Sequence, residues 1–259
     1  MKRIGIYAHW DARAEVKRYV EHSVRRLREE CDEVHFVSTS PLAQRELDKL
    51  RPSAATVRTK ENLGYDFGMW RDVIATLDLT QLDELVLTNS SVFGPVRSLR
   101  DAFARMAAVP CDFWAMTDSE QLTWHLQSYF LVFRQKALRH PGFAQFWSSV
   151  LPYSNKRQVI YSYELGLTTF LTECGLEGRA FAPVERIAEV PPRWPWSSRR
   201  MHPTTNPSVY LPFTLLENEM PFVKVEVFRD NVARVPLDSL RRAIRATGYD
   251  LTLLEYDPR

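Results

Sequence analysis

The chain has 259 residues, and its 34 lysines and arginines against 32 aspartates and glutamates give a formal net charge of +2 at pH 7. Hydrophobic residues make up 45% of the chain, which is enough apolar surface to exclude a mainly disordered state. The nearly balanced charge argues against a dedicated nucleic-acid binder. The length predicts one large domain, or a domain with an appendage.

The three cysteines, Cys31, Cys111 and Cys174, lie far apart and form no CxxC pair. This usage is typical of reduced thiols in a reducing compartment. No run of 18 apolar residues predicts a transmembrane helix, and the apolar run at 4–7 is too short for a signal peptide. We therefore expect a cytoplasmic protein, and the basic segment 239–246 leaves open a peripheral association with the inner face of the cytoplasmic membrane.

The first part of the chain alternates predicted strands and helices. Strands are expected at 3–7, 33–38, 55–59, 84–88 and 112–116, and helices at 13–30, after Ser40-Pro41, at 66–77 and at 98–107. This alternation predicts an α/β fold with a mainly parallel sheet flanked by helices. Ligands of such sheets lie beyond the carboxyl ends of the strands, which singles out 8–11, 61–66 and 89–95.

The second half of the chain is organised differently. Strands are expected at 127–134 and 221–228, and helices at 135–150, at 163–174 up to Gly175, and at 239–246 after an Asp238 N-cap. The prolines of 190–212 predict a loop, in which Trp194 and Trp196 are candidates for stacking on sugars. The chain therefore ends in a loop-strand-helix extension.

The segment 61–68 offers the first candidate site. Its glycines, Gly64 and Gly68, let the backbone approach a ligand closely, and amides at a helix start suit phosphate. Asn62 and Asp66 supply side chains for a base or a ribose. Asp66 alone is equally well explained as a helix N-cap.

Asn89, Ser90 and Ser91 follow the strand 84–88 directly. Their oxygens suit ribose or phosphate, but a hard cation is bound weakly without carboxylates. A turn that satisfies the amides at the strand end is the alternative interpretation.

Two further groups carry possible chemistry. Asp118, His125 and Gln127 lie between two predicted strands, where His125 suits a donor or base, or a structural hydrogen bond. Glu164 opens a predicted helix, where the helix dipole favours a carboxylate in any case and where a general base is the functional alternative. Serine-hydrolase, zinc-protease, P-loop and dinucleotide motifs are absent from the sequence.

Together these segments resemble the rhamnan synthesis protein F family of bacterial glycosyltransferases, and more broadly the inverting GT-A enzymes. The segments that carry the resemblance are 6–11, 61–72, 87–96, 112–119, 125–133, 163–175 and 206–229. The resemblance implies a GT-A-like, Rossmann-like catalytic domain over 1–190, with a donor half at 1–118 and an acceptor half at 119–190. The extension 191–259 is then expected to pack on the same domain.

The resemblance also implies roles. The expected activity is an inverting transfer of L-rhamnose from dTDP-rhamnose to a bacterial cell-surface polysaccharide (O-antigen, rhamnan or capsule). Glu164 takes the position of the catalytic base, and Tyr163 that of a preceding acid. The implied donor-binding residues are His9, Asp11, Asn62, Gly64, Asp66, Arg71, Asn89, Ser90 and Ser91, and the implied sugar or acceptor residues are Asp118, His125, Gln127 and Lys224. The implied partners are a nucleotide sugar and a lipid-linked or polymeric glycan, within a possible polysaccharide-assembly complex, and not a nucleic acid.

One departure affects the metal. The family usually has an aspartate in the middle of the triplet, where this chain has Ser90. A divalent cation (Mg²⁺ or Mn²⁺) beside Ser91 is therefore an open expectation, and Arg71, Arg134 or Lys224 is the alternative charge for a leaving diphosphate. The altered triplet also leaves open a catalytically inactive module that binds polysaccharide or nucleotide sugar.

Overall fold

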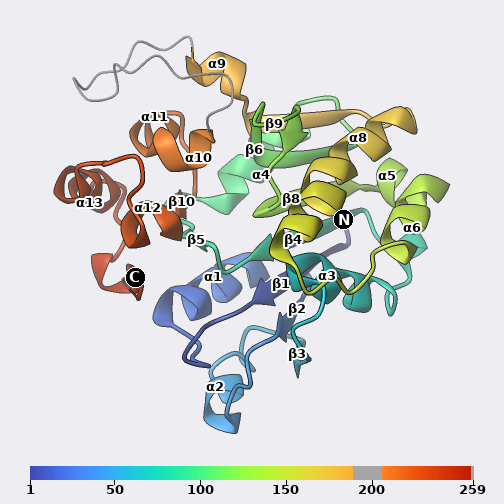
Figure 1. Cartoon of the computed structure of the whole chain (residues 1–259), viewed down its shortest axis with the longest axis horizontal. Coiled ribbons are helices and arrows are strands. Elements are labelled where there is room, and N and C mark those ends of the chain that lie inside the picture. The colour runs from blue at the N-terminus through green and yellow to red at the C-terminus, as the bar shows by residue number, and fades with distance from the viewer. Residues whose placement is uncertain (189–205, 258–259) are drawn as a thin grey trace.

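A computed structural model describes residues 1–188 and 206–257. Within them the main sheet has eight strands in the order β3-β2-β1-β4-β8-β6-β7, with β9 paired to β6 (Figure 1). The strands are β1 (Arg3–His9), β2 (Glu33–Ser38), β3 (Thr56–Thr59), β4 (Glu84–Asn89), β6 (Phe113–Ser119), β7 (His125–Leu126), β8 (Phe130–Arg134) and β9 (Gly178–Ala182). The first four are mutually parallel, β6 and β9 are parallel, and β8 runs antiparallel to β4 and β6. The predicted mainly parallel sheet flanked by helices is confirmed.

Helices cover both faces of this sheet (Figure 1). The first set consists of α1 (Arg18–Arg28), α2 (Gln44–Asp48), α3 (Tyr65–Ile74), α4 (Leu99–Ala107), α5 (Gln135–Arg139), α6 (Pro141–Ser148), α7 (Lys156–Val159), α8 (Leu165–Glu173) and α9 (Val184–Ala188). The C-terminal set consists of α10 (Pro207–Tyr210), α11 (Pro212–Glu217), α12 (Val225–Arg229) and α13 (Leu237–Arg245). A two-stranded sheet of β5 (Val92–Phe93) and β10 (Val223–Lys224) joins this set to the body of the protein. In the described residues, no helix is both long and apolar enough to cross a membrane.

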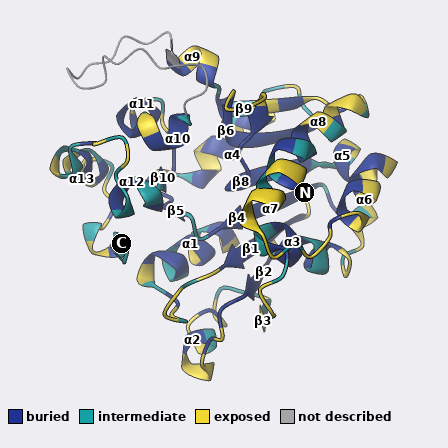
Figure 2. Cartoon of the chain, viewed as in Figure 1, coloured by how far each residue is buried: buried dark blue, intermediate teal, exposed yellow. Residues whose placement is uncertain are grey.

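Alternate strand residues enter two separate cores, because successive side chains of a strand point to opposite faces. In β4, Leu85 and Leu87 pack in the core that holds α3, α6 and α8, whereas Val86 packs in the core that holds α1, α4 and the C-terminal helices. Figure 2 shows the strands buried between these layers. Gly5 allows α1 to approach closely, since a Cβ there would lie 2.9 Å from Leu27 Cδ2.

Several predicted boundaries are wrong for identifiable reasons. The helix expected at 135–150 is divided into α5 and α6, because the residue before Pro141 is extended and its chain turns there. The strand expected at 221–228 pairs over only two residues, since its partner β5 is equally short, and it continues as α12. The strand expected at 127–134 begins only at Phe130.

The C-terminal region holds more helix than its prolines predict. Asn206 caps α10 by accepting a hydrogen bond from the Ser208 amide, and Pro207 occupies the first helical turn, where its missing N–H costs nothing. Asp238 lies inside α13 and does not cap it, because the helix begins one residue earlier. Trp194 and Trp196 lie outside the described residues.

Candidate functional site

The carboxyl ends of β1 and β4 lie side by side, as the parallel pairing predicts. The register pairs Ala8 with Asn89, and the Ser90 amide donates to the Ala8 carbonyl at 3.1 Å. The Tyr19 hydroxyl of α1 donates to the Ser90 carbonyl at 2.8 Å. The triplet Asn89-Ser90-Ser91 is therefore fixed at the sheet edge where α/β proteins bind ligands.

Helix α3 brings Asp66 to the same edge. Gly64 is the residue before the helix and adopts the left-handed conformation (φ +82°), which side chains disfavour. The alternative interpretation of Asp66 as an N-cap is therefore wrong, since Asp66 is the second residue of the helix. Its Oδ2 instead accepts a hydrogen bond of 2.8 Å from Asn89 Nδ2.

Glu164 reaches the site from a distorted helix. A helical run begins at Lys156, passes through a π-helical turn (Ile160–Glu164) and continues as α8. Glu164 therefore lies in the middle of this run and not in a first turn as predicted. The Ser128 hydroxyl donates to Glu164 Oε1 at 2.9 Å. π-Helical turns inside α-helices are frequent at functional sites.

Tyr163, which occupies the position of a first acid in the resemblance, is a core residue. It is buried, stacks on Tyr153 with ring centroids 5.7 Å apart, and lies 5.6 Å from the Phe67 ring. Its hydroxyl accepts a hydrogen bond of 2.6 Å from the Leu151 amide. Tyr163 therefore anchors the π-helical turn, while the next residue projects to the sheet edge.

Lys224 enters from the C-terminal region. Strand β10 pairs Lys224 with Val92 of β5, and the Val225 amide donates to the Ser91 carbonyl at 2.9 Å. The Lys224 ammonium donates to Ser91 Oγ at 3.2 Å and lies 4.7 Å from the centre of the Tyr129 ring. We call Asp66, Asn89, Ser91, Glu164 and Lys224 the edge cluster.

The charges of the edge cluster influence one another. Burial and the nearby Glu164 carboxylate raise the pKa of Asp66 to about 6, against the opposing effects of Lys224 and the Asn89 hydrogen bond. Burial lowers the pKa of Lys224, while Glu164, Glu226 and Asp66 oppose that shift. Two carboxylates and one ammonium therefore share a site where water screens charges weakly.

Two of the predicted donor residues, His9 and Asp11, are engaged within the protein. His9 is buried, its Nδ1 lies 2.9 Å from Ser38 Oγ, and burial lowers its pKa to about 4, so it is neutral at pH 7. Asp11 Oδ1 accepts hydrogen bonds from the amides of its own turn, and Oδ2 lies 3.6 Å from Lys17 Nζ. Asn62 is exposed, and the Gly64 amide donates to a carbonyl of the neighbouring loop.

Asp118 and Gln127 also have protein partners. Asp118 accepts from Trp124 Nε1 at 2.9 Å and from the Val184 amide at 2.6 Å. Gln127 Nε2 donates to Asn206 Oδ1 at 2.9 Å. The Asp118 bond to Val184 ties the end of β6 to α9, and the Gln127 bond ties the segment between β7 and β8 to the start of α10.

The remaining candidates have partners outside the edge cluster. His125 is buried, and its Nδ1 lies 2.9 Å from the Thr123 carbonyl. The Arg71 guanidinium bonds Asp72 and the Val150 carbonyl. Arg134 is paired in register with Glu84, at the amino end of β4 and therefore at the opposite edge of the sheet. Of the three cationic alternatives for the diphosphate, Lys224 alone joins the edge cluster.

Beside Ser91, where a divalent metal is an open expectation, the side-chain oxygens of Ser91 and Asn89 already have partners within the protein. Mg²⁺ and Mn²⁺ need several oxygen ligands with at least one or two carboxylates. Ser91 Oγ is occupied by the Lys224 ammonium, and Asn89 Oδ1 accepts from the Ser91 amide and hydroxyl. Across the described ranges, no three His, Cys, Asp or Glu side chains gather so as to hold a metal ion.

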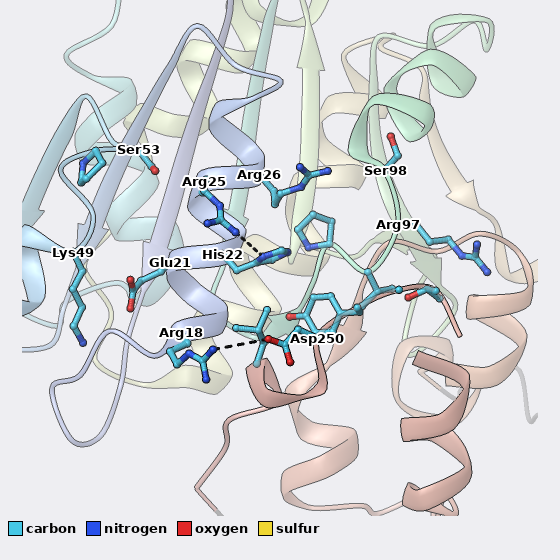
Figure 3. A pocket seen from close by; sticks show the side chains of 17 residues that line it. Arg18, Glu21, His22, Arg25, Arg26, Lys49, Ser53, Arg97, Ser98 and Asp250 are labelled. Atoms are coloured by element: carbon cyan, nitrogen blue, oxygen red, sulfur yellow. Dashed lines mark hydrogen bonds and ion pairs between the residues drawn. The ribbon is translucent and has the colours of Figure 1, made fainter. Parts of the chain in front are cut away.

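A cavity of about 750 Å³ lies elsewhere, between α1 and the segment after α13 (Figure 3). It is rich in arginine, but its cations have partners: Arg18 lies 3.9 Å from Asp250, and Arg25 bonds His22 at 3.4 Å. None of the predicted site residues lines it. We therefore place the candidate site at the sheet edge and not in this cavity.

Ser128 and Tyr129 contact the edge cluster, but the sequence did not predict a role for either residue. Ser128 holds Glu164, and Tyr129 lies beneath Lys224. A signal was present, since both follow Gln127 in a predicted strand. Their irregular position between β7 and β8, which turns them toward the edge, is visible only in the fold.

A family model described as rhamnan synthesis protein F matches residues 34–257. The chain belongs to the rhamnan synthesis protein F family. The resemblance expected from the sequence is therefore confirmed.

Two curated relatives match only part of their own lengths. The uncharacterized protein y4gN of Sinorhizobium fredii is 30% identical over 141 residues, which cover 52% of this chain and 37% of that protein. Virulence protein VirA of Vibrio anguillarum is 25% identical over 197 residues, which cover 68% of this chain and 63% of VirA. The matched parts thus span 37% to 63% of these relatives.

Solved structures with a similar fold are distant. A putative glucose-1-phosphate thymidylyltransferase from Bacillus anthracis has a TM-score of 0.46 at 10% identity, over 70% of this chain and 87% of that one. TarS from S. aureus in complex with UDP has a TM-score of 0.39 at 13% identity, over 54% of this chain and 48% of TarS. At these scores neither likeness carries an argument about the site.

Proposed function

We propose that the chain is an inverting glycosyltransferase in which Glu164 is the general base. The observation that supports this most is the placement of Glu164 beside Asp66 and Lys224, at the edge where β1 and β4 end. Ser128 holds one carboxylate oxygen, Oε1, and Oε2 has no hydrogen-bond partner among the described residues. A partly exposed carboxylate fixed through one oxygen is suited to take a proton with the other.

The proposed step is a single displacement. The acceptor hydroxyl gives its proton to Glu164 as its oxygen attacks the anomeric carbon of the donor. The bond from that carbon to the diphosphate breaks on the opposite face, and the electron pair leaves with the nucleoside diphosphate. Attack and departure on opposite faces invert the anomeric centre. Asn89, Ser90 and Ser91 are the proposed contacts for the donor's ribose and phosphates.

The proposed donor is dTDP-β-L-rhamnose, and the proposed acceptor is a growing surface polysaccharide on a lipid carrier at the inner face of the cytoplasmic membrane. The family description, rhamnan synthesis, supports the sugar. The matched regions span only part of the curated relatives. The acceptor, and the polysaccharide-assembly complex in which the chain would act, are therefore part of this proposal as well.

Glu164→Gln tests the base. The variant keeps the Ser128 hydrogen bond but accepts no proton, so we expect kcat to fall about 10²- to 10⁴-fold while dTDP binds as in the wild type. Glu173→Gln, on an exposed position at the end of α8, is the matched control. An NMR spectrum of the product gives the anomeric configuration.

The outcomes separate the alternatives. Wild-type turnover in Glu164→Gln would remove Glu164 as the base. A retained anomeric configuration would remove the single displacement. A wild-type protein that binds oligosaccharides, but neither binds nor turns over dTDP-, UDP- or GDP-sugars, would favour the inactive binding module.

A further inference from the structure

The further inference concerns the charge that meets the donor diphosphate, and it rests on the proposed transferase function. A departing nucleoside diphosphate gains negative charge at the oxygen that leaves the sugar, so a positive group must face it. A divalent metal beside Ser91 is one expectation for that charge. The Ser91 hydroxyl, however, already accepts a hydrogen bond from the Lys224 ammonium at 3.2 Å.

Two backbone contacts fix Lys224 beside the triplet. The Val225 amide donates to the Ser91 carbonyl at 2.9 Å, and the Val96 amide donates to the Pro221 carbonyl at 2.7 Å. Gly94 makes this approach possible, because a Cβ there would lie 2.5 Å from the Pro221 oxygen. The C-terminal region is therefore held against the residues that follow β4 by its own backbone.

The surroundings of the ammonium leave it able to bind an anion. An ammonium has three N–H donors, and in the described part of the chain Ser91 Oγ is the oxygen that accepts from it. The Tyr129 ring lies beneath it at 4.7 Å and favours the cation. The carboxylates of Asp66 and Glu164 balance its charge until a more strongly charged anion is present.

We propose that the Lys224 ammonium binds the donor diphosphate in place of a divalent cation, so that nucleotide binding and sugar transfer need no metal. Lys224 donates hydrogen bonds to the phosphate oxygens and keeps its proton. As the bond to the sugar breaks, the electron pair stays on the leaving oxygen, and the fixed positive charge stabilises it. Asn89 and Ser91 then orient the phosphates instead of serving as metal ligands.

The test measures the Kd of dTDP, UDP and GDP, each by calorimetry, with excess EDTA and with excess Mg²⁺. We expect the preferred nucleotide to bind the wild type equally in both conditions. Lys224→Met is expected to bind it about 10- to 100-fold more weakly, as the loss of one charge-assisted hydrogen bond predicts. Lys224→Arg keeps the charge and is expected to recover most of the affinity in EDTA.

Lys2→Met is the matched control, since it removes one charge from an exposed lysine next to the amino end of β1, at the opposite edge of the sheet. Wild-type affinity in Lys224→Met, or wild-type binding that needs Mg²⁺, would overturn the inference and leave the transferase function intact. No binding of any of the three nucleotides in either condition would overturn both. If Lys224→Met fails to fold, the comparison of wild type in EDTA and Mg²⁺ and the Lys224→Arg variant still decide.

Discussion

Asp66→Asn is expected to stabilise the protein at neutral pH. In the folded protein the pKa of Asp66 is raised from 3.8 to about 6, mainly by burial and then by Glu164. The negative charge of Asp66 therefore lowers the free energy of unfolding. The asparagine removes this charge, and its Oδ1 can still accept the hydrogen bond that Asn89 Nδ2 now gives Asp66 Oδ2.

The sign and size follow from linkage. Between pH 3.8 and about 6 the folded protein binds more protons at this site than the unfolded chain does, so the Asp66 contribution to stability falls as pH rises through this window. Each pKa unit corresponds to about 1.4 kcal/mol, and the shift therefore sets an upper limit of about 3 kcal/mol. Solvent screening of a side chain that is only partly buried reduces the expected gain to about 1–2 kcal/mol above pH 6.

Urea denaturation of the wild type and Asp66→Asn at pH 5.0 and 7.5 measures this difference. We expect the variant's advantage to be larger at pH 7.5. Asp78→Asn is a control of opposite sign, because hydrogen bonds from Thr80 lower the pKa of the exposed Asp78. A less stable Asp66→Asn at pH 7.5, or an advantage that does not change with pH, would refute the reasoning.

Three further substitutions test the architecture of the site. Gly94→Ala places a Cβ 2.5 Å from the Pro221 oxygen at a backbone φ of +137°, so urea denaturation should show a loss of about 2–4 kcal/mol, and calorimetry a weaker affinity for the nucleotide. Ser128→Ala removes the hydrogen bond to Glu164, so steady-state kinetics should show kcat reduced about 3- to 10-fold with KM unchanged, and an unchanged kcat would contradict its positioning role. Arg134→Met breaks hydrogen bonds to three carbonyls, one in the last turn of α4 and two just after it, so stability should fall by about 2–3 kcal/mol without a change in nucleotide Kd. A changed Kd would return Arg134 to the site.

The sequence predicted the sheet because its strands are short, strongly apolar runs separated by helices, and that pattern is local. It also placed Asn89 and Asp66 at one edge, since both follow strands of a parallel sheet. The hydrogen bond between their side chains depends on how α3 packs against β4. The contact of Lys224 with Ser91 joins residues 133 positions apart, and the pairing of β10 with β5 is similarly long-range, so no local pattern exists for either.

The same limit explains the errors at Glu164 and in the C-terminal region. The apolar positions of 163–174 indicate a helix, but the π-helical turn before them is set by Tyr163 packing into the aromatic core. The alternating apolar residues of 221–228 have the period of a strand. A strand needs a partner, and β5 offers two residues, so the chain satisfies its remaining amides as a helix.

Ser91 links folding to the chemistry that we propose. Its carbonyl accepts from the backbone of the C-terminal region, and its hydroxyl accepts from the Lys224 ammonium, so one residue holds both the segment and the charge that the segment carries. Phe222 and Phe228, on either side of this contact, are buried in the core that also contains α1 and α4. The positive charge of the site is therefore present only when the C-terminal region has packed on that core. A cation supplied in this way is formed by folding itself, whereas a metal would have to be bound afterwards from solution.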